Sequence, residues 1–370
     1  MRVRLISENE AVAYAGPGAL VVHSASVSYA IGRSATVILV DAGDRPDGSS
    51  VSSRDQIDLR APFPRAAAAR LGSADPKWPI HGFVRTGDGC LPLGLLRVVM
   101  FSSRPNGAGH FPVRLDDLDA PRDPDWLMDC TLHLDEPLSF DLLDRVRPVT
   151  PAASSDLNWL DHLPRDPIEA MRSFVAAWYA DSPPVSDGAA PESLPRPLRE
   201  FYRAARGRPE VLGQQNQIFR PSQIYAAEDG GSVVIGAENQ GVFRLRVDVS
   251  AADPEVWYLD ADDPPVVERM PLSGFLLGFL LWEAALASPY GGWAAITSAE
   301  VDGLTRQLRR VPLPPMRWPG DPTHHYVGPG VAVLVSHADE EHAEVYVGAR
   351  HRAALRELRE PGFTWDIFSG

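Results

Sequence analysis

The chain has 370 residues, of which 44% are hydrophobic and 23% charged, so it is long enough and apolar enough to bury its own core. Its 35 basic and 49 acidic residues give a net charge of −14, which argues against a nucleic-acid-binding protein, because affinity for phosphates comes largely from Lys and Arg. The same charge suits basic protein partners.

The N-terminal residues, the longest apolar run and the two cysteines indicate the cellular compartment of the protein. The first residues lack the apolar core of a signal peptide, and the longest apolar run, residues 274–282, falls short of the ~20 residues that cross a bilayer. Cys90 and Cys130 form no C-x-x-C motif, so we expect two reduced, partly buried thiols. We therefore expect a cytoplasmic protein without a membrane segment.

Segments rich in Pro, Ser and Asp divide the chain. Residues 148–156 are typical of a linker, and residues 181–193 are either a loop or a second boundary. These segments predict a β-rich N-terminal domain over residues 1–150 and a second domain over residues 160–370.

The N-terminal domain is expected to consist mostly of strands. Apolar runs at residues 19–22, 35–40 and 95–101 are separated by clusters of Gly, Pro, Ser and Asp, and one short helix is expected over residues 65–70. A β-sandwich and an α+β module both fit this pattern. No residue here carries identifiable chemistry, so the sequence leaves the role of this domain open.

The second domain is expected to begin with two helices. Asp166 at a capping position, Pro167 after it and Glu169 three residues on predict a helix start, and apolar residues then follow at helical spacing. Another helix is expected after Ser193 and can end at Gly207.

Strands are predicted next, over residues 232–235, 242–249, 255–259 and 266–270. Within 242–249, apolar and polar side chains alternate, which predicts a half-buried strand of an antiparallel sheet. The apolar set is Phe243, Leu245, Val247 and Val249, and the opposite set is Arg244, Arg246 and Asp248. Residues 272–286 form a helix that is apolar nearly all round and must be buried.

The tail is expected to add smaller elements to the same domain. Apolar runs at residues 331–335 and 344–347 flank a polar turn, which predicts a hairpin. A short helix over residues 352–358 and a closing segment over 363–367 follow. The pattern as a whole predicts the α+β class, with a mixed or antiparallel sheet packed by helices after a β-rich N-terminal domain.

No catalytic motif is complete in the sequence. The elbow G-x-S-x-G, H-E-x-x-H and zinc-type Cys/His pairs are absent, and Lys77, the only lysine, cannot complete a phosphate-binding loop. Four histidines, His324, His325, His337 and His342, surround the predicted hairpin, but their spacing matches no metal template. We expect solvated loop histidines, no metal, no cofactor and a non-enzymatic protein.

One segment is unusually acidic. From Asp248 to Glu268 there are seven acids and no Lys or Arg. Such a density of like charge would steer a cationic partner surface, and the aromatic side chains within it could anchor the contact. The predicted partner-binding residues are Asp253, Glu255, Trp257, Tyr258, Asp260, Asp262 and Asp263. The alternative is a solvated loop rim with Trp257 and Tyr258 in the core.

Short motifs across residues 194–294 follow one another in a distinctive order and spacing. They are Leu194-Pro195 with Leu198, Phe201 and Tyr202, then Gly207-Arg208, Gln215-Asn216, Ile218, residues 221–224, 238–242, 271–275, 281–283 and 289–293. Together with the tail over residues 311–370, they resemble the actinobacterial branch of the SMI1/KNR4 (SUKH) family. Residues 1–150 lie outside the resemblance.

This resemblance implies a fold and a role. The fold is an α+β domain with a mixed or antiparallel sheet packed by helices, and the role is non-enzymatic. Bacterial members are often immunity proteins of polymorphic toxin systems that bind and block a cognate toxin, commonly a nuclease. A basic toxin would suit the acidic segment. The N-terminal domain departs from single-domain immunity proteins, and the alternative is an accessory or scaffold protein in a larger assembly. In it, residues 1–150 dock and the second domain recruits or regulates.

Overall fold

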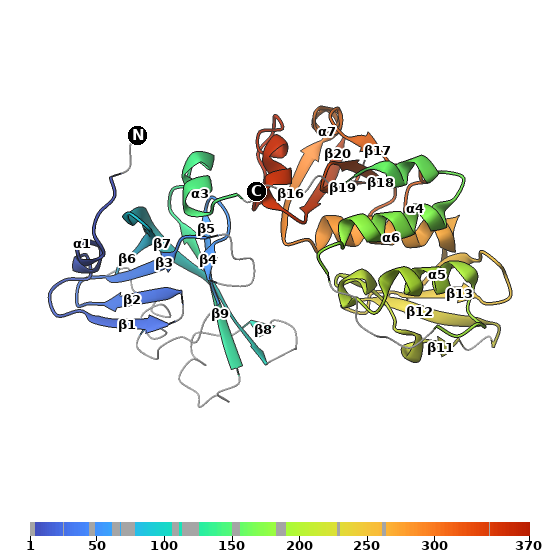
Figure 1. Cartoon of the computed structure of the whole chain (residues 1–370), viewed down its shortest axis with the longest axis horizontal. Helices are drawn as coiled ribbons and strands as arrows, with labels where there is room; N and C mark the ends of the chain where they lie inside the picture. Colours follow the sequence, from blue (N-terminus) through green and yellow to red (C-terminus); the bar gives the residue numbers. More distant parts are fainter. Residues whose placement is uncertain are drawn as a thin grey trace. The chain divides into compact units, whose positions relative to one another are not determined.

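The computed structural model divides into two compact units after Val149 (Figure 1). Helices and three β-sheets place the described chain in the α+β class, as predicted. The structure describes residues 4–24, 26–43, 49–60, 67, 78–105, 111–112, 126–149, 156–182, 190–227, 230–260, 264–339 and 341–370.

Unit 1 is built on a nine-stranded sheet. In order across the sheet, the strands are β1 (Leu20–Ser24), β2 (Val27–Ile31), β3 (Thr36–Asp41), β6 (Ile80–Thr86), β7 (Gly89–Pro105), β9 (Trp126–Leu134), β5 (Gln56–Arg60) and β4 (Ser50–Val51), with β8 (Phe111–Pro112) beside β7. The β3–β6 pair is parallel and the neighbouring pairs are antiparallel, so the sheet is mixed. The predicted strands at 19–22, 35–40 and 95–101 fall in β1, β3 and β7.

Apolar clusters lie on both faces of this sheet. The larger cluster runs along one face of the sheet from Tyr29 of β2 to Leu59 of β5. Helix α3 (Phe140–Val146) contributes Leu143 to it. On the other face, α1 (Glu8–Ala13) packs through Ala11 near Cys90.

Two further sequence predictions concern unit 1. Cys90 and Cys130 are free and buried, as expected of reduced thiols, and burial raises the pKa of both. The predicted helix over residues 65–70 lies outside the described residues apart from Ala67.

Unit 2 contains two antiparallel sheets. The first, called here the β12–β14 sheet, has the order β10 (Asn216–Ile218), β12 (Ser232–Glu238), β13 (Arg244–Asp248), β14 (Glu255–Leu259) and β15 (Val266–Pro271), with β11 (Tyr225–Ala226) beside β12. The second, the β18–β20 sheet, has the order β17 (Arg309–Arg310), β18 (Thr323–Gly328), β19 (Val331–His337), β20 (His342–Ala349), β16 (Tyr290–Thr297) and β21 (Ile367–Phe368). The predicted strands 232–235, 255–259 and 266–270 and the predicted hairpin are therefore confirmed. The strand predicted over 242–249 is shorter, Arg244–Asp248, and Val249, which was expected on its apolar side, lies beyond it and is exposed.

Helix α6 (Leu272–Leu286) lies at the centre of unit 2, with the bounds that the sequence predicts. Residues 272–285 are all buried, because α6 contacts strands of both sheets and also the helices α4 (Pro167–Trp178) and α5 (Arg196–Ala205). Figure 1 shows these three helices running side by side. A helix that is apolar on every side has no polar face to expose to solvent, and at the centre of unit 2 none of its sides needs to be exposed.

The remaining helices are short. They are η2 (Asn158–His162), η3 (Pro209–Leu212), η4 (Pro221–Gln223), α7 (Ser298–Thr305) and η5 (Arg352–Leu358). The start of α4 is as predicted, since the Glu169 amide donates to Asp166 Oδ1 at 3.1 Å. The expected helix over residues 352–358 is a 3₁₀ helix instead of an α-helix. Of the closing segment, only its end at Ile367 enters a strand, which pairs with β16.

Helix α6 carries one buried acid, Glu283. Its Oε2 accepts hydrogen bonds from the amides of Gln214 (2.6 Å) and Gln215 (3.0 Å), and its Oε1 accepts from the amide (2.8 Å) and the side-chain Nδ2 (3.1 Å) of Asn216. The carboxylate therefore fastens the segment before β10 to the central helix. Burial raises the pKa of Glu283, and the four hydrogen bonds oppose this shift only in part.

The close contact between α6 and β20 gives a stability test. A Cβ atom at Gly348 would lie 2.0 Å from the backbone oxygen of Ala284, which cannot move without displacing the helix. We expect Gly348→Ala to lower the free energy of unfolding by about 1–3 kcal/mol or more. Gly303→Ala in α7 is the matched control, because its Cβ meets nothing closer than 3.8 Å, and it should be neutral or stabilising by up to about 1 kcal/mol. Equal midpoints of urea unfolding for the two variants would contradict this contact.

The Glu283 carboxylate gives a second test. Glu283→Gln leaves only one oxygen where four donors converge, and each buried donor without a partner costs ~1–3 kcal/mol. We expect a loss of about 2–4 kcal/mol in the free energy of unfolding, measured by urea titration. Glu341→Gln, at an exposed position, should leave the unfolding midpoint unchanged.

The same residue predicts a pH dependence. Because the folded pKa of Glu283 is raised above its ordinary value of 4.5, the stability from its protonation is present below pH 4.5 and is lost as pH rises through the folded pKa. Over that interval the stability of the wild type should fall with pH more steeply than that of Glu283→Gln. Identical slopes would show that Glu283 has no raised pKa.

Candidate partner-binding surface

The predicted acidic segment covers the end of β13, the loop after it, β14 and the chain that leads to β15. Asp262 and Asp263 lie outside the described residues, so the structure does not place them. The others divide into three groups: Asp253, Glu255 and Asp260 are exposed, Trp257 is half-buried and Tyr258 is buried.

Asp253 and Glu268 are acids of this segment whose internal partners belong to the fold. Asp253 accepts hydrogen bonds from the Ser273 amide (2.9 Å) and hydroxyl (2.7 Å), and so satisfies an amide in the first turn of α6 that has no partner within the helix. Glu268 is buried and accepts from the Tyr258 hydroxyl at 2.8 Å and from the Arg317 amide at 3.2 Å. Both carboxylates therefore stabilise the fold.

Tyr258 lies on the core side of β14. Its ring packs edge-on against Phe243 with centroids 5.1 Å apart, and it is only 7% exposed. Burial and the neighbouring Glu268 carboxylate raise its pKa well above the usual value. Because side chains alternate along a strand, Trp257 points to the opposite face. Tyr258 is thus removed from the predicted surface, whereas Trp257 remains on it.

A row of side chains crosses the outward face of the β12–β14 sheet. The strand register aligns five residues, one from each strand from β11 to β15, and paired positions point to the same face. This cross-strand row consists of Tyr225, Val234, Arg246, Trp257 and Val267. The Arg246 Cζ atom lies 5.4 Å from the centre of the Trp257 ring, which is within cation–π range.

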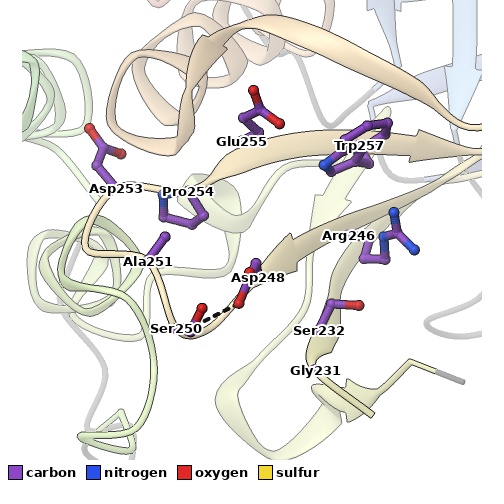
Figure 2. Close-up of a pocket in the computed structure, with 10 residues that line it drawn as sticks. All are labelled: Gly231, Ser232, Arg246, Asp248, Ser250, Ala251, Asp253, Pro254, Glu255 and Trp257. Carbon is purple, nitrogen blue, oxygen red and sulfur yellow. Dashed lines mark hydrogen bonds between the residues drawn. The ribbon is translucent and has the colours of Figure 1, made fainter. Parts of the chain in front are cut away.

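An open hollow of about 650 Å³ adjoins the row. Figure 2 shows Glu255 and Trp257 on one strand and Arg246 and Asp248 on the next, around the same space. Its lining residues are Gly231, Ser232, Arg246, Asp248, Ser250, Ala251, Asp253, Pro254, Glu255 and Trp257. The Ser250 amide donates to Asp248 Oδ1 at 2.7 Å, which fixes the turn that closes one end of the hollow.

The outward face is not uniformly acidic. Arg244, Arg246 and Asp248 point to this face of β13, and the register sets Arg244 opposite Leu259 and Arg246 opposite Trp257 of β14. The expectation of an acidic segment without basic residues holds along the sequence but not across the sheet, because neighbours on a sheet come from different segments. The alternation in residues 242–249 already placed both arginines on this face. What the sequence did not reveal was that β13 pairs with β14, which sets Arg246 next to the acidic segment.

Several residues of the motif pattern meet in a hydrogen-bond network. Glu238 accepts from the Gln215 side chain (3.3 Å) and from the amides of Gln240 (2.7 Å) and Val242 (3.2 Å). The Asn239 side chain donates back to Gln215 at 3.3 Å. These groups hold the β12–β13 turn against the start of β10, next to the segment that Glu283 fastens. These hydrogen bonds stabilise the turn and the strand ends that they connect.

The four histidines do not converge on one point. The expectation of solvated loop histidines is wrong for His325, which lies in β18 and is buried. Burial lowers its pKa to about 4. His324 accepts a hydrogen bond from Arg310 at 2.9 Å and lies 5.9 Å, ring to ring, from His337. His342 contacts Asp339 at the hairpin tip. Among the described residues, no three His, Cys, Asp or Glu side chains are grouped as metal ligands.

A Ser–His contact occurs in unit 1, and its surroundings bear on enzymatic chemistry. Ser28 Oγ lies 2.8 Å from His23 Nδ1, and Arg85 donates to the same oxygen at 2.7 Å. Arg85 also pairs with Glu8 at 2.9 Å and with Asp41. Since Ser28 is only 3% exposed, its oxygen is not open to a substrate. The network ties α1 to the strands β1, β2, β3 and β6.

The residues that the structure brings together on one accessible face are Tyr225, Arg246, Asp248, Glu255 and Trp257. They come from β11, β13 and β14, and all of them except Tyr225 line the hollow. In the part of the chain described here, no helix has the length and apolar character needed to span a membrane. No protein-family model, curated protein or solved structure matches this chain.

Proposed function

We propose that unit 2 is a protein-binding module that contacts its partner through the outward face of the β12–β14 sheet. The chain would act as an immunity protein of a bacterial polymorphic toxin system, and the partner would be a basic toxin, a nuclease being a suitable example. Neutralisation would follow from covering the toxin, without bond-making chemistry. We place this action in the cytoplasm, where the chain would meet the toxin.

The cross-strand row is the observation that carries this proposal. Trp, Tyr and Arg are the residues that most often dominate binding energy at protein interfaces, and the register sets one of each on a single face. Tyr225 is 44% exposed and Trp257 is half-buried, so aromatic surface of this row faces solvent. On the opposite face the same sheet packs against α6.

The family resemblance supports the same role. Motif residues far apart in the sequence, such as Gln215 and Glu238, or Asn216 and Glu283, bond to one another directly. A shared set of internal contacts is what a common fold requires. We propose on this ground that residues 160–370 form an SMI1/KNR4-like domain of the actinobacterial branch.

Unit 1 favours a second candidate, an accessory or scaffold protein. It has a sheet and apolar clusters of its own. Its strand β1 lies at one end of the sheet order, with Leu20 55% and Val21 39% exposed. In this alternative unit 1 docks onto an assembly through that strand, and unit 2 recruits or regulates.

The two candidates can be separated with surface variants of the full chain. The partner to test is the product of the open reading frame beside this gene, measured by calorimetry and by growth of cells that express both proteins. In the double variant Tyr225→Ala/Trp257→Ala, each lost anchor is worth ~2 kcal/mol or more. We expect Kd to rise by at least about 100-fold and protection from the toxin to be lost.

The matched control is Leu20→Ala/Val21→Ala, which removes similar apolar area from unit 1. It should keep both affinity and protection, and both double variants should unfold at the wild-type midpoint. Loss of the partner only in the Leu20/Val21 variant would favour the scaffold. Full protection by the Tyr225/Trp257 variant would contradict the immunity proposal.

A further inference from the structure

The hollow beside the cross-strand row has an unequal charge balance. Three carboxylates, Asp248, Asp253 and Glu255, line it together with one guanidinium, that of Arg246. Opposite charges within ~4–6 Å stabilise each other, and an excess of carboxylates favours a cation from outside. The hollow therefore suits a positively charged group.

Glu255 is the carboxylate that is available for such a group. Within the described chain it makes no hydrogen bond or ion pair, and its side chain is exposed at the start of β14. Asp253, in contrast, is held by Ser273, and Asp248 by the Ser250 amide. Figure 2 shows Glu255 and Trp257 on the same strand, and both residues line the hollow.

Trp257 adds the aromatic surface that distinguishes one cation from another. A guanidinium is planar and weakly hydrated, stacks on aromatic rings and pairs with a carboxylate through two hydrogen bonds, whereas an ammonium is a compact and strongly hydrated charge. The chain's own Arg246 already makes such a contact, because its guanidinium lies 5.4 Å from the Trp257 ring centre.

The size of the hollow agrees with this ligand. Its volume of about 650 Å³ falls within the ~300–1,000 Å³ of pockets that hold small ligands. One long side chain fits with bridging water, which costs little affinity at a wet interface.

We infer that the hollow receives an arginine side chain of the partner protein, with its guanidinium paired to Glu255 and lying beside Trp257. The inference rests on the proposed function, since it names the chemistry by which the same surface would recognise a basic toxin. It also adds a site that can be probed without the partner.

The probe is a short peptide, acetyl-Gly-Arg-Gly-amide, added to the full chain labelled with 5-fluorotryptophan and followed by ¹⁹F NMR. The Trp257 resonance, assigned by its loss in Trp257→Phe, should shift saturably with a Kd of ~1–10 mM, as expected for a single side chain. The citrulline peptide, which has the same shape without charge, should bind at least about tenfold more weakly. The lysine peptide should bind several-fold more weakly.

The matched variants are Glu255→Gln at the hollow and Glu357→Gln at an exposed position in η5. An exposed ion pair changes affinity by about two- to fivefold, so we expect that loss for Glu255→Gln and none for Glu357→Gln. Equal binding of the arginine and citrulline peptides, equal binding of the lysine peptide, or no effect of Glu255→Gln would each overturn the inference.

Failure of this inference and failure of the proposed function have different signatures. If the arginine peptide does not bind but Tyr225→Ala/Trp257→Ala loses the partner, the surface stands and the arginine pocket is wrong. If the peptide binds as expected while that double variant keeps full affinity for the partner, the pocket stands and the proposed use of this surface is wrong.

Discussion

The fold of unit 2 depends on the complete burial of α6. A helix whose every side is apolar is stable only when protein surrounds it, and here strands of two sheets and the helices α4 and α5 do so. Each large side chain such as Phe275 or Leu280 gains ~1.5–3 kcal/mol from leaving water. The backbone of β20 comes so close to the helix that Gly348 has no room for a side chain. The two sheets are thus held through one shared element.

Buried carboxylates hold several loops and strand ends of unit 2 in place. Glu283, Glu238 and Glu268 are buried, and each accepts hydrogen bonds from backbone amides or side chains of the segments around it. A buried polar group is tolerated when it is bonded in this way. Part of the chain's acidic excess therefore supports loops and strand ends, and it is not a measure of the charge that a partner meets.

The sequence alone predicted the elements whose structure depends on residues within a single segment. The bounds of α6 follow from an unbroken apolar run, and the start of α4 follows from Asp166, Pro167 and Glu169, all of which act locally. Only part of the candidate surface could be predicted in this way. Period-two alternation separates Trp257 from Tyr258, but only the register of β13 against β14 sets Arg246 beside the tryptophan. Pairing between distant segments is decided by the packed core, which a single segment does not contain.

The two faces of the β12–β14 sheet are linked by the strands themselves. Val247 and Val256 are fully buried in the core, next to Arg246, Asp248, Glu255 and Trp257 on the outward side. The backbone that carries the outward side chains is consequently fixed before any partner arrives. Ordering a flexible surface on association consumes part of the free energy that contacts release, and a surface with a rigid base avoids most of that loss. If this face binds a partner as proposed, the rigid core beneath it would lower the entropy cost of association.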